Sequence, residues 1–205
     1  MLAWPGWPFQ AAPSNIDESV KSDEKPLDYV RRLACEKSMT AIPQAQSGEL
    51  IIAADTIVVL DADILGKPSN AQSAVVMLKS LKNRSHQVIT AIAVQLAGQP
   101  DFWQDVCISD VRMRNYSDQE IEAYIQSGDP FDKAGGYAIQ NSRFNPVEHF
   151  SGCYASVMGL PLCHLERTLR KISGYLPCDM SEICRKKLEY ECPITRRVLA
   201  GEDIG

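Results

Sequence analysis

An acidic residue stands where two apolar runs meet in Leu50-Ile51-Ile52-Ala53-Ala54-Asp55-Thr56-Ile57-Val58-Val59-Leu60. Short apolar runs such as 50–54 and 56–60 are typical of buried β-strands, so we expect one strand on each side of Asp55. Burying an unpaired carboxylate costs on the order of several kcal/mol. Asp55 therefore needs a partner, a metal ion or a raised pKa, and its position indicates a chemical role rather than a turn or a helix cap.

Helical and strand patterns alternate along the chain around this stretch. Four segments carry helix signals, either an opening proline, an N-cap or a capping box, and two further segments have the alternation typical of strands. They are the helices at 27–37, beyond 66–70, beyond 117–120 and from 161 onward, and the strands at 88–96 and 106–113. The alternation predicts an α/β fold and, most simply, one domain.

Composition narrows the classes of partner. The 205 residues carry a formal net charge of −5, from 21 basic and 26 acidic side chains, so we expect no nucleic-acid partner. No apolar run approaches the roughly 20 residues that span a bilayer, and the N-terminus lacks the basic start and apolar core of a signal peptide. The seven cysteines are scattered with no Cys-x-x-Cys pair, which disfavours a zinc ribbon or a disulfide framework. We therefore expect a cytoplasmic protein without a membrane partner.

Four ionisable residues stand out as candidates for chemistry: Glu18, Lys37, Asp55 and Lys67. At about 100° per residue, Lys37 points with the buried stripe of its helix. Lys67 lies just before a helix N-terminus, where backbone N–H groups and the helix dipole favour an anion. Two carboxylates can hold a hard cation such as Mg²⁺ and activate water, while two lysines neutralise phosphate oxygens. Spacing alone leaves the ordinary alternatives open: a snorkelling lysine, a turn lysine and a solvated loop acid.

Six segments, in order, match the motifs of a known family. They are Pro13–Ser19 (PSNIDES), Leu33–Lys37 (LACEK), Ala54–Val58 (ADTIV), Ile64–Pro68 (ILGKP), Asp132–Gln140 (DKAGGYAIQ) and Val157–Leu162 (VMGLPL). Through them the chain resembles, from about residue 9 to residue 172, the Maf-like nucleoside triphosphate pyrophosphatases, also called septum formation inhibitors. The resemblance implies a Maf/ITPase-like α/β fold, with an extended mixed sheet flanked by helices and two lobes around a central cleft. It also implies a pyrophosphatase domain over 1–175 and a homodimer. The residues beyond it, 176–205, are charged and carry cysteines, so we expect them to form a C-terminal extension.

The resemblance also implies an activity and a set of catalytic residues. Members of the family hydrolyse a nucleoside triphosphate between its α and β phosphates, giving the monophosphate and pyrophosphate with a divalent cation, Mg²⁺ or Mn²⁺. Asp55 would be the proton acceptor, and Glu18 and Asp55 would hold the metal. Lys37 and Lys67 would bind the phosphates.

Three further residues are candidates for substrate binding. The resemblance implies that Thr56 and Gln140 select the base, and a glutamine side chain suits the amide-like edge of a pyrimidine because it both donates and accepts hydrogen bonds. Lys133 is a candidate for the phosphates, with an ordinary loop lysine as the alternative. Asp55-Thr56 together with Ile139-Gln140 resembles the branch that acts on dTTP and UTP. The alternative within the family is the branch that acts on 7-methyl-GTP.

One departure from the family pattern concerns the start of the sequence. Members begin with a strand that leads into a Ser-x-Ser-Pro-Arg-Arg loop and a helix, and nothing of that kind precedes Trp7. Bidentate arginines are strong phosphate binders, so their loss is expected to weaken triphosphate binding. Two readings follow. One is a start codon assigned too far downstream, which we favour because the retained motifs show no decay; the other is a shortened protein that binds nucleotides or a division-linked partner without catalysis.

Overall fold

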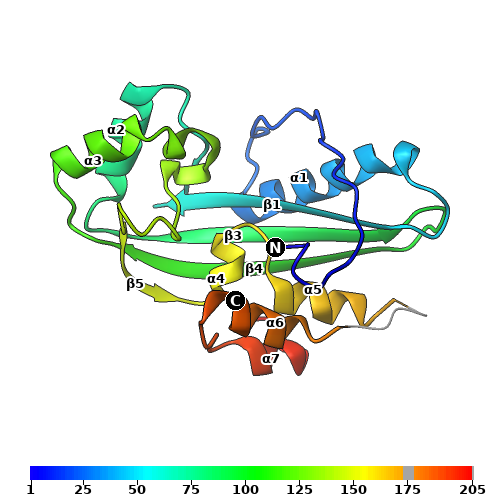
Figure 1. The fold of residues 1–205 in the computed structure, drawn as a ribbon. Coiled ribbons are helices and arrows are strands. Elements are labelled where there is room, and N and C mark those ends of the chain that lie inside the picture. Colours follow the sequence, from blue (N-terminus) through cyan, green and yellow to red (C-terminus); the bar gives the residue numbers. More distant parts are fainter. Residues whose placement is uncertain (173–177, 205) are drawn as a thin grey trace.

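A five-stranded sheet forms the centre of the computed structural model, which describes residues 1–172 and 178–204 (Figure 1). The strands lie side by side in the order β2-β1-β3-β4-β5. Their bounds are β1 Leu50–Leu60, β2 Asp63–Leu65, β3 Ser85–Leu96, β4 Phe102–Met113 and β5 Val147–Ser151. With helices around this sheet, the predicted α/β class is confirmed.

The sheet differs from the mixed sheet that the resemblance implied. Each neighbouring pair of strands in the described residues runs antiparallel. The chain turns from β1 into β2 within residues 61–62 and from β3 into β4 within residues 97–101. Connections this short can join only antiparallel strands, since a parallel pair needs a crossover of a dozen residues or more.

Strand β1 is continuous through Asp55, which corrects the prediction of two strands over 50–54 and 56–60. The β1 backbone pairs with β3 throughout this region, with Asp55 opposite Ala91 and Thr56 opposite Thr90. A charged side chain does not interrupt a strand when its backbone groups stay in the ladder and the charge is neutralised from another element. The two apolar runs therefore predicted β-structure correctly, but the prediction that the strand is interrupted at Asp55 was wrong.

The helices begin at the capping signals found in the sequence. Asn70 accepts a hydrogen bond from the backbone N–H of Ser73, and Ser117 forms a reciprocal capping box with Glu120. The bounds are α1 Pro26–Ala41, α2 Ala71–Leu81, α3 Asp118–Gln126, α4 Tyr154–Val157, α5 Leu162–Leu169, α6 Met180–Leu188 and α7 Thr195–Leu199. The four predicted helices correspond to α1, α2, α3 and α5. None of the helices in the described residues is long and apolar enough to span a membrane.

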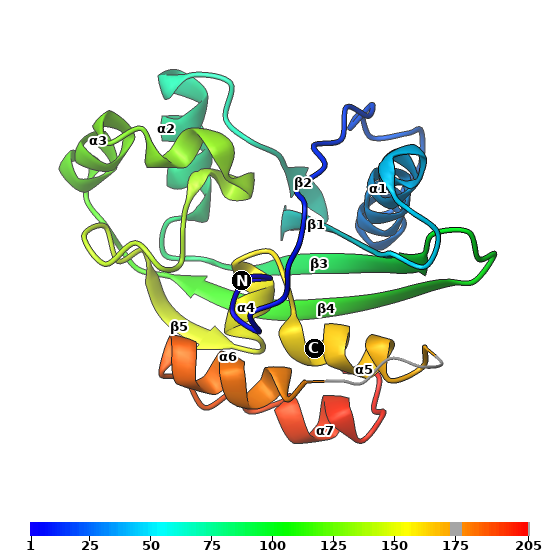
Figure 2. The same ribbon diagram turned by 45° about the vertical axis from the view of Figure 1, so that its right-hand side comes forward.

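The two faces of the sheet carry different helices, because side chains alternate between faces along each strand. On one face α1 buries Val30 and Leu33 against Ile57 and Ile89. On the other face α5 and α6 pack against strand residues such as Ile92. Figure 2 shows α1 above the sheet and α5, α6 and α7 below it. Asp55 shares the parity of Ile57, so its side chain lies on the α1 face, whereas Thr56 lies on the face of α4 and α5.

A second lobe gathers at one end of the strands. Helices α2 and α3 bury Leu78, Leu81 and Ile121 against Val58 and Val88 (Figure 1). The 3-10 segments over 129–132 and 134–136 belong to this lobe: the first packs on α3, and the second packs on α2 and back on β1. Gly135 has φ +70°, and a Cβ there would come within 2.8 Å of the Val58 side chain, so this close approach requires glycine. The loop that carries Lys133 is thereby fixed against the strand that carries Asp55.

The charged C-terminal region forms two helices that pack on the rest of the chain. Met180 and Cys184 of α6 and Val198 of α7 are buried. They join the same apolar cluster as Leu165 of α5 or lie next to it. The division into a domain over 1–175 and an extension over 176–205 stays a prediction, since its boundary falls outside the described residues.

Candidate functional site

Asp55 has its charge partner on α1. The ammonium group of Lys37 donates to Asp55 Oδ1 at 2.5 Å and lies 2.8 Å from Glu18 Oε1. The exposed fractions are 10% for the Asp55 side chain, 19% for Lys37 and 47% for Glu18. Three of the four catalytic candidates therefore meet in one contact between β1, α1 and the N-terminal segment.

The loop that carries Glu18 is held onto α1 by two residues that the sequence analysis did not single out. The Tyr29 hydroxyl donates to the backbone carbonyl of Glu18 at 2.6 Å, and Arg32 Nη2 donates to the carbonyl of Ser19 at 2.9 Å. Arg32 also donates to both carboxylate oxygens of Glu24, at 2.6 and 2.8 Å. These contacts fix the backbone on both sides of the Glu18 side chain. Their signal in the sequence is slight, because nothing local shows that the loop returns to the helix.

The environment shifts the ionisation of all three groups. Burial raises the pKa of Asp55, and although the ammonium of Lys37 lowers it, the net shift is upward. Burial on its own would lower the pKa of Lys37, but its hydrogen bonds to Asp55 and Glu18 outweigh that effect and raise it. The hydrogen bond from Lys37 lowers the pKa of Glu18. Lys37 therefore stays charged and Glu18 stays ionised, while Asp55 is the group that can exchange a proton nearer to neutral pH.

A cavity of about 320 Å³ opens beside Asp55, a volume within the usual range for small-molecule sites. Its lining combines β1, the glycine-containing loop and the turn before α5. Four of the residues implied for the substrate are part of this lining, namely Thr56, Lys67, Lys133 and Gln140, whereas Lys37 lines a neighbouring groove. Lys67 is exposed and contributes positive charge near Glu18 and Asp55 without direct contact.

Lys133 enters the cavity with its charge already partnered. Its ammonium group lies 3.0 Å from Asp129 Oδ1 and 2.6 Å from Asp132 Oδ1. It also donates to the backbone carbonyl of Asp129 at 3.0 Å. Binding an anionic ligand through Lys133 would therefore compete with two carboxylates, which makes Lys67 the freer of the two cavity lysines.

The open edge of β1 explains how two consecutive residues on opposite faces line one cavity. Within the described residues, β2 covers the outer edge of β1 only at Val58–Leu60. At Asp55 and Thr56 this edge faces the cavity, so a ligand can contact both sides of the strand. Thr56 is fixed there by its hydroxyl, which lies 2.9 Å from that of Thr90 on β3.

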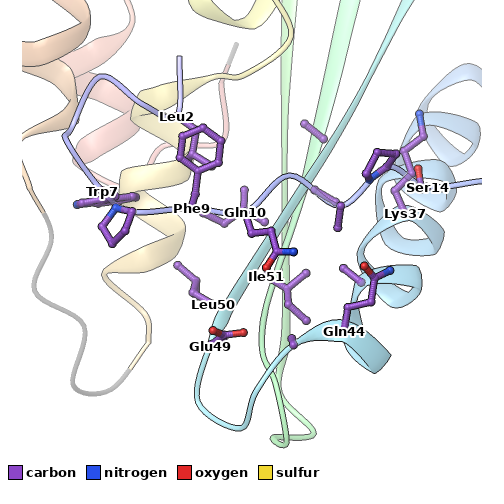
Figure 3. A pocket seen from close by; sticks show the side chains of 18 residues that line it. Leu2, Trp7, Phe9, Gln10, Ser14, Lys37, Gln44, Glu49, Leu50 and Ile51 are labelled. Carbon is purple, nitrogen blue, oxygen red and sulfur yellow. The ribbon is translucent and has the colours of Figure 1, made fainter.

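A larger groove of about 660 Å³ adjoins the cavity and shares Ala54 with it (Figure 3). Figure 3 shows Lys37 and Ser14 at one end, with Leu2, Trp7 and Phe9 towards the other. The N-terminal segment, the end of α1 and the first half of β1 form its walls, and its charged lining residues are Lys37 and Glu49. The smaller cavity has Asp55, Lys67 and Lys133 in its lining and is the better candidate for chemistry, while Lys37 contacts Asp55 from the wall of the groove.

The residues present fit a divalent cation in part. Glu18 and Asp55 contact the same nitrogen atom, so their oxygens lie within reach of one ion, and carboxylates are the preferred ligands of Mg²⁺. In residues 1–172 and 178–204 no group of three or more His, Cys, Asp and Glu side chains is arranged to hold a metal. A pair of carboxylates suits Mg²⁺ that is shared with substrate phosphates, which is the usual arrangement for this ion.

Comparison with known proteins identifies the family. A sequence model described as "Maf-like protein" matches residues 1–172 of the chain. The chain belongs to the Maf family. It is 38% identical over 194 residues to the dTTP/UTP pyrophosphatase of Thermomicrobium roseum, covering 95% of this chain and 88% of that protein. It is 41% identical over 167 residues to the dTTP/UTP pyrophosphatase of Methylococcus capsulatus, covering 82% of each chain. The Maf relative from Hahella chejuensis, also a dTTP/UTP pyrophosphatase, is 43% identical over 166 residues, covering 80% of this chain and 81% of that one.

Proposed function

We propose that this Maf-family protein hydrolyses dTTP and UTP to the monophosphate and pyrophosphate. The observation that supports the proposal is the contact of Lys37 with Asp55 and Glu18, because Asp55 also lines a cavity together with Lys67, Thr56 and Gln140. The names of relatives that cover most of the chain support the choice of nucleotide.

Asp55 acts as the general base. Its carboxylate accepts a proton from water as the water oxygen attacks the α-phosphorus, and the bond between this phosphorus and the bridging oxygen of pyrophosphate breaks. A general base works best when its pKa approaches the working pH, and burial raises the pKa of Asp55 in that direction. Lys37 holds one carboxylate oxygen in place, and a carboxylate has further lone pairs with which to take the proton.

The lysines stabilise the negative charge of the phosphates. Lys37 keeps its proton because two carboxylates face it, and Lys67 adds a second positive charge at the rim of the cavity. Electrostatic stabilisation of this kind is often the largest contribution to phosphoryl-transfer catalysis. Lys133 is a further phosphate ligand once it exchanges one of its acidic partners for the substrate.

Glu18 and Asp55 are the residues that would hold the divalent cation. When bound, such an ion neutralises phosphate charge and helps to ionise water. The loop contacts of Tyr29 and Arg32 keep Glu18 next to Asp55 for this purpose. A homodimer, a cytoplasmic location and the absence of a nucleic-acid partner stay predictions from the resemblance and the composition.

The products of UTP hydrolysis in ¹⁸O-labelled water test the proposal. The purified chain is incubated with UTP and Mg²⁺, and the products are separated and weighed by mass spectrometry. We expect UMP and pyrophosphate, with the label in UMP, because water attacks the α-phosphorus. Formation of UDP and phosphate, or label in the pyrophosphate, would contradict the assigned reaction. A parallel reaction with chelator in place of Mg²⁺ should give no products.

A further inference from the structure

A chain of three oxygen atoms links the cavity to the interior of the protein. The Thr90 hydroxyl lies 2.8 Å from the backbone carbonyl oxygen of Ser156 and 2.9 Å from the Thr56 hydroxyl. Thr90 and Ser156 are fully buried, whereas Thr56 lines the cavity. The link joins the middle of β3 to α4 on one side and to the open edge of β1 on the other.

The direction of the protons in this chain follows from the chemistry of the groups. A carbonyl oxygen only accepts, so the single proton of the Thr90 hydroxyl is donated to Ser156. Thr90 can then only accept from Thr56, and the proton of Thr56 is directed away from the cavity. The reverse orientation would leave two buried oxygen atoms 2.8 Å apart with no proton between them, and that contact is repulsive.

We propose that Thr90 is a specificity-determining residue, because it makes the Thr56 oxygen an obligate hydrogen-bond acceptor towards the base. The inference rests on the proposed function and deepens it. Uracil and thymine present a ring N3–H donor between two carbonyl oxygens, whereas cytosine presents an unprotonated N3 acceptor. An acceptor at Thr56 can therefore form a hydrogen bond with the N3–H of uracil or thymine. With cytosine, the lone pairs of Thr56 and of N3 would repel each other.

The surroundings of Thr56 leave room for such a contact. Gly159, at φ +104°, borders the Thr56 hydroxyl, and a Cβ at this position would lie 3.7 Å from Thr56 Oγ1. The N–H of Gly159 donates to the same Ser156 carbonyl at 2.8 Å, so the turn is held independently of Thr90. Removing the Thr90 hydroxyl should therefore change the direction of the Thr56 proton more than the backbone around it.

Binding of α,β-methylene UTP and α,β-methylene CTP to the full chain, measured by calorimetry, tests the proposal. We expect the wild type to prefer the uridine analogue by about 30-fold, in line with the cost of one unmatched polar contact. In Thr90→Val the Thr56 hydroxyl is free to donate, so this preference should fall to about threefold or less. The fall should come partly from tighter binding of the cytidine analogue. Thr90→Ser, which keeps the hydroxyl, should retain the preference.

The possible results distinguish a role of Thr90 in base selectivity from a merely structural role. Equal weakening of both analogues in Thr90→Val would assign Thr90 a merely structural role and overturn the proposal, as would a wild type that does not distinguish them. Thr168→Val, at another fully buried threonine, controls for the loss of a buried hydroxyl and should leave the preference unchanged. If Thr90→Val does not fold, Thr56→Val must lose the preference that Thr56→Ser keeps. Because the analogues are not cleaved, the result is independent of whether the protein hydrolyses UTP.

Discussion

Two buried aspartates on strands of the same sheet, Asp55 and Asp105, are paired with cations from helices in different ways. Their side chains are 10% and 8% exposed. Asp105 on β4 accepts two hydrogen bonds from Arg167 of α5, at 2.8 and 2.5 Å, and further bonds from Thr168 and a backbone N–H. Asp55 on β1 receives one bond from Lys37, which also contacts Glu18.

We infer that access and completeness of pairing, rather than burial, separate the proposed reactive carboxylate, Asp55, from the structural one, Asp105. The planar guanidinium group of arginine bonds to both oxygens of Asp105, so this carboxylate has little remaining capacity to accept a proton or bind a ligand. The lysine at Asp55 is a single point charge shared between two acids, and Asp55 itself lines a cavity. One pair is suited to joining a strand to a helix, and the other to exchanging protons and binding phosphate.

Lys37→Met should give the largest effect on the reactive side of this comparison. We expect kcat/KM for UTP to fall by about 10³-fold, because the change removes a preorganised positive charge and leaves two carboxylates facing each other. Steady-state release of pyrophosphate measures it. Lys79→Met is the matched control, because that lysine pairs with Asp118 on the surface and should be replaceable. A fall of less than about tenfold in the Lys37 variant would contradict the role of this pair.

Arg167→Met should give the largest effect on the structural side. Breaking a buried pair leaves Asp105 as an uncompensated charge, so we expect a loss of about 3 kcal/mol in the free energy of unfolding. Arg167 also donates to the backbone carbonyl of Glu202, so the C-terminal segment should loosen as well. Urea denaturation measures the loss, and kcat per folded molecule should stay at the wild-type value. Arg185→Met, at a surface pair, should leave the free energy of unfolding almost unchanged.

The acid limb of the pH profile of kcat/KM should report the ionisation of Asp55. Burial raises the pKa of Asp55, so the fraction of ionised base, and with it the rate, should fall as the pH drops through a value above the ordinary aspartate pKa of about 3.9. The charge of Lys37 lowers this pKa, so Lys37→Met should move the limb to higher pH. UTP ionises in the same way in both experiments, so it does not contribute to the difference between the acid limbs of the wild type and the Lys37 variant. An unmoved limb would mean that another group is the base.

Tyr29→Phe should give the smallest effect. The change removes only the hydroxyl that donates to the Glu18 carbonyl, and one such bond contributes about 1 kcal/mol. We therefore expect a decrease of about fivefold in kcat/KM, seen mainly as a higher Mg²⁺ requirement, with little change in the urea midpoint. Titration of the rate with Mg²⁺ measures it. An equal effect at all Mg²⁺ concentrations would indicate that Tyr29 does not act through Glu18.

The sequence predicted what depends on local pattern. Periodicity placed Lys37 on the buried side of its helix, and capping residues placed the starts of α2 and α3. It could not predict that Asp55 lies inside a continuous strand, because the neutralising charge comes from a helix formed by distant residues. The Thr56–Thr90 contact depends on the register between two strands 34 residues apart, for which no local signal exists. The contact of Tyr29 with the Glu18 loop is a tertiary event of the same kind.

The different roles of Asp55 and Asp105 can be tested by replacing each aspartate with asparagine and measuring both kcat/KM for UTP and the free energy of unfolding. We expect Asp55→Asn to lower kcat/KM by at least about 100-fold while the protein stays folded. Asp105→Asn should lower the free energy of unfolding by about 3 kcal/mol and leave kcat/KM of the folded protein unchanged. If Asp55→Asn kept the wild-type rate, or both variants lost activity and stability alike, the distinction between a reactive and a structural pair would be wrong.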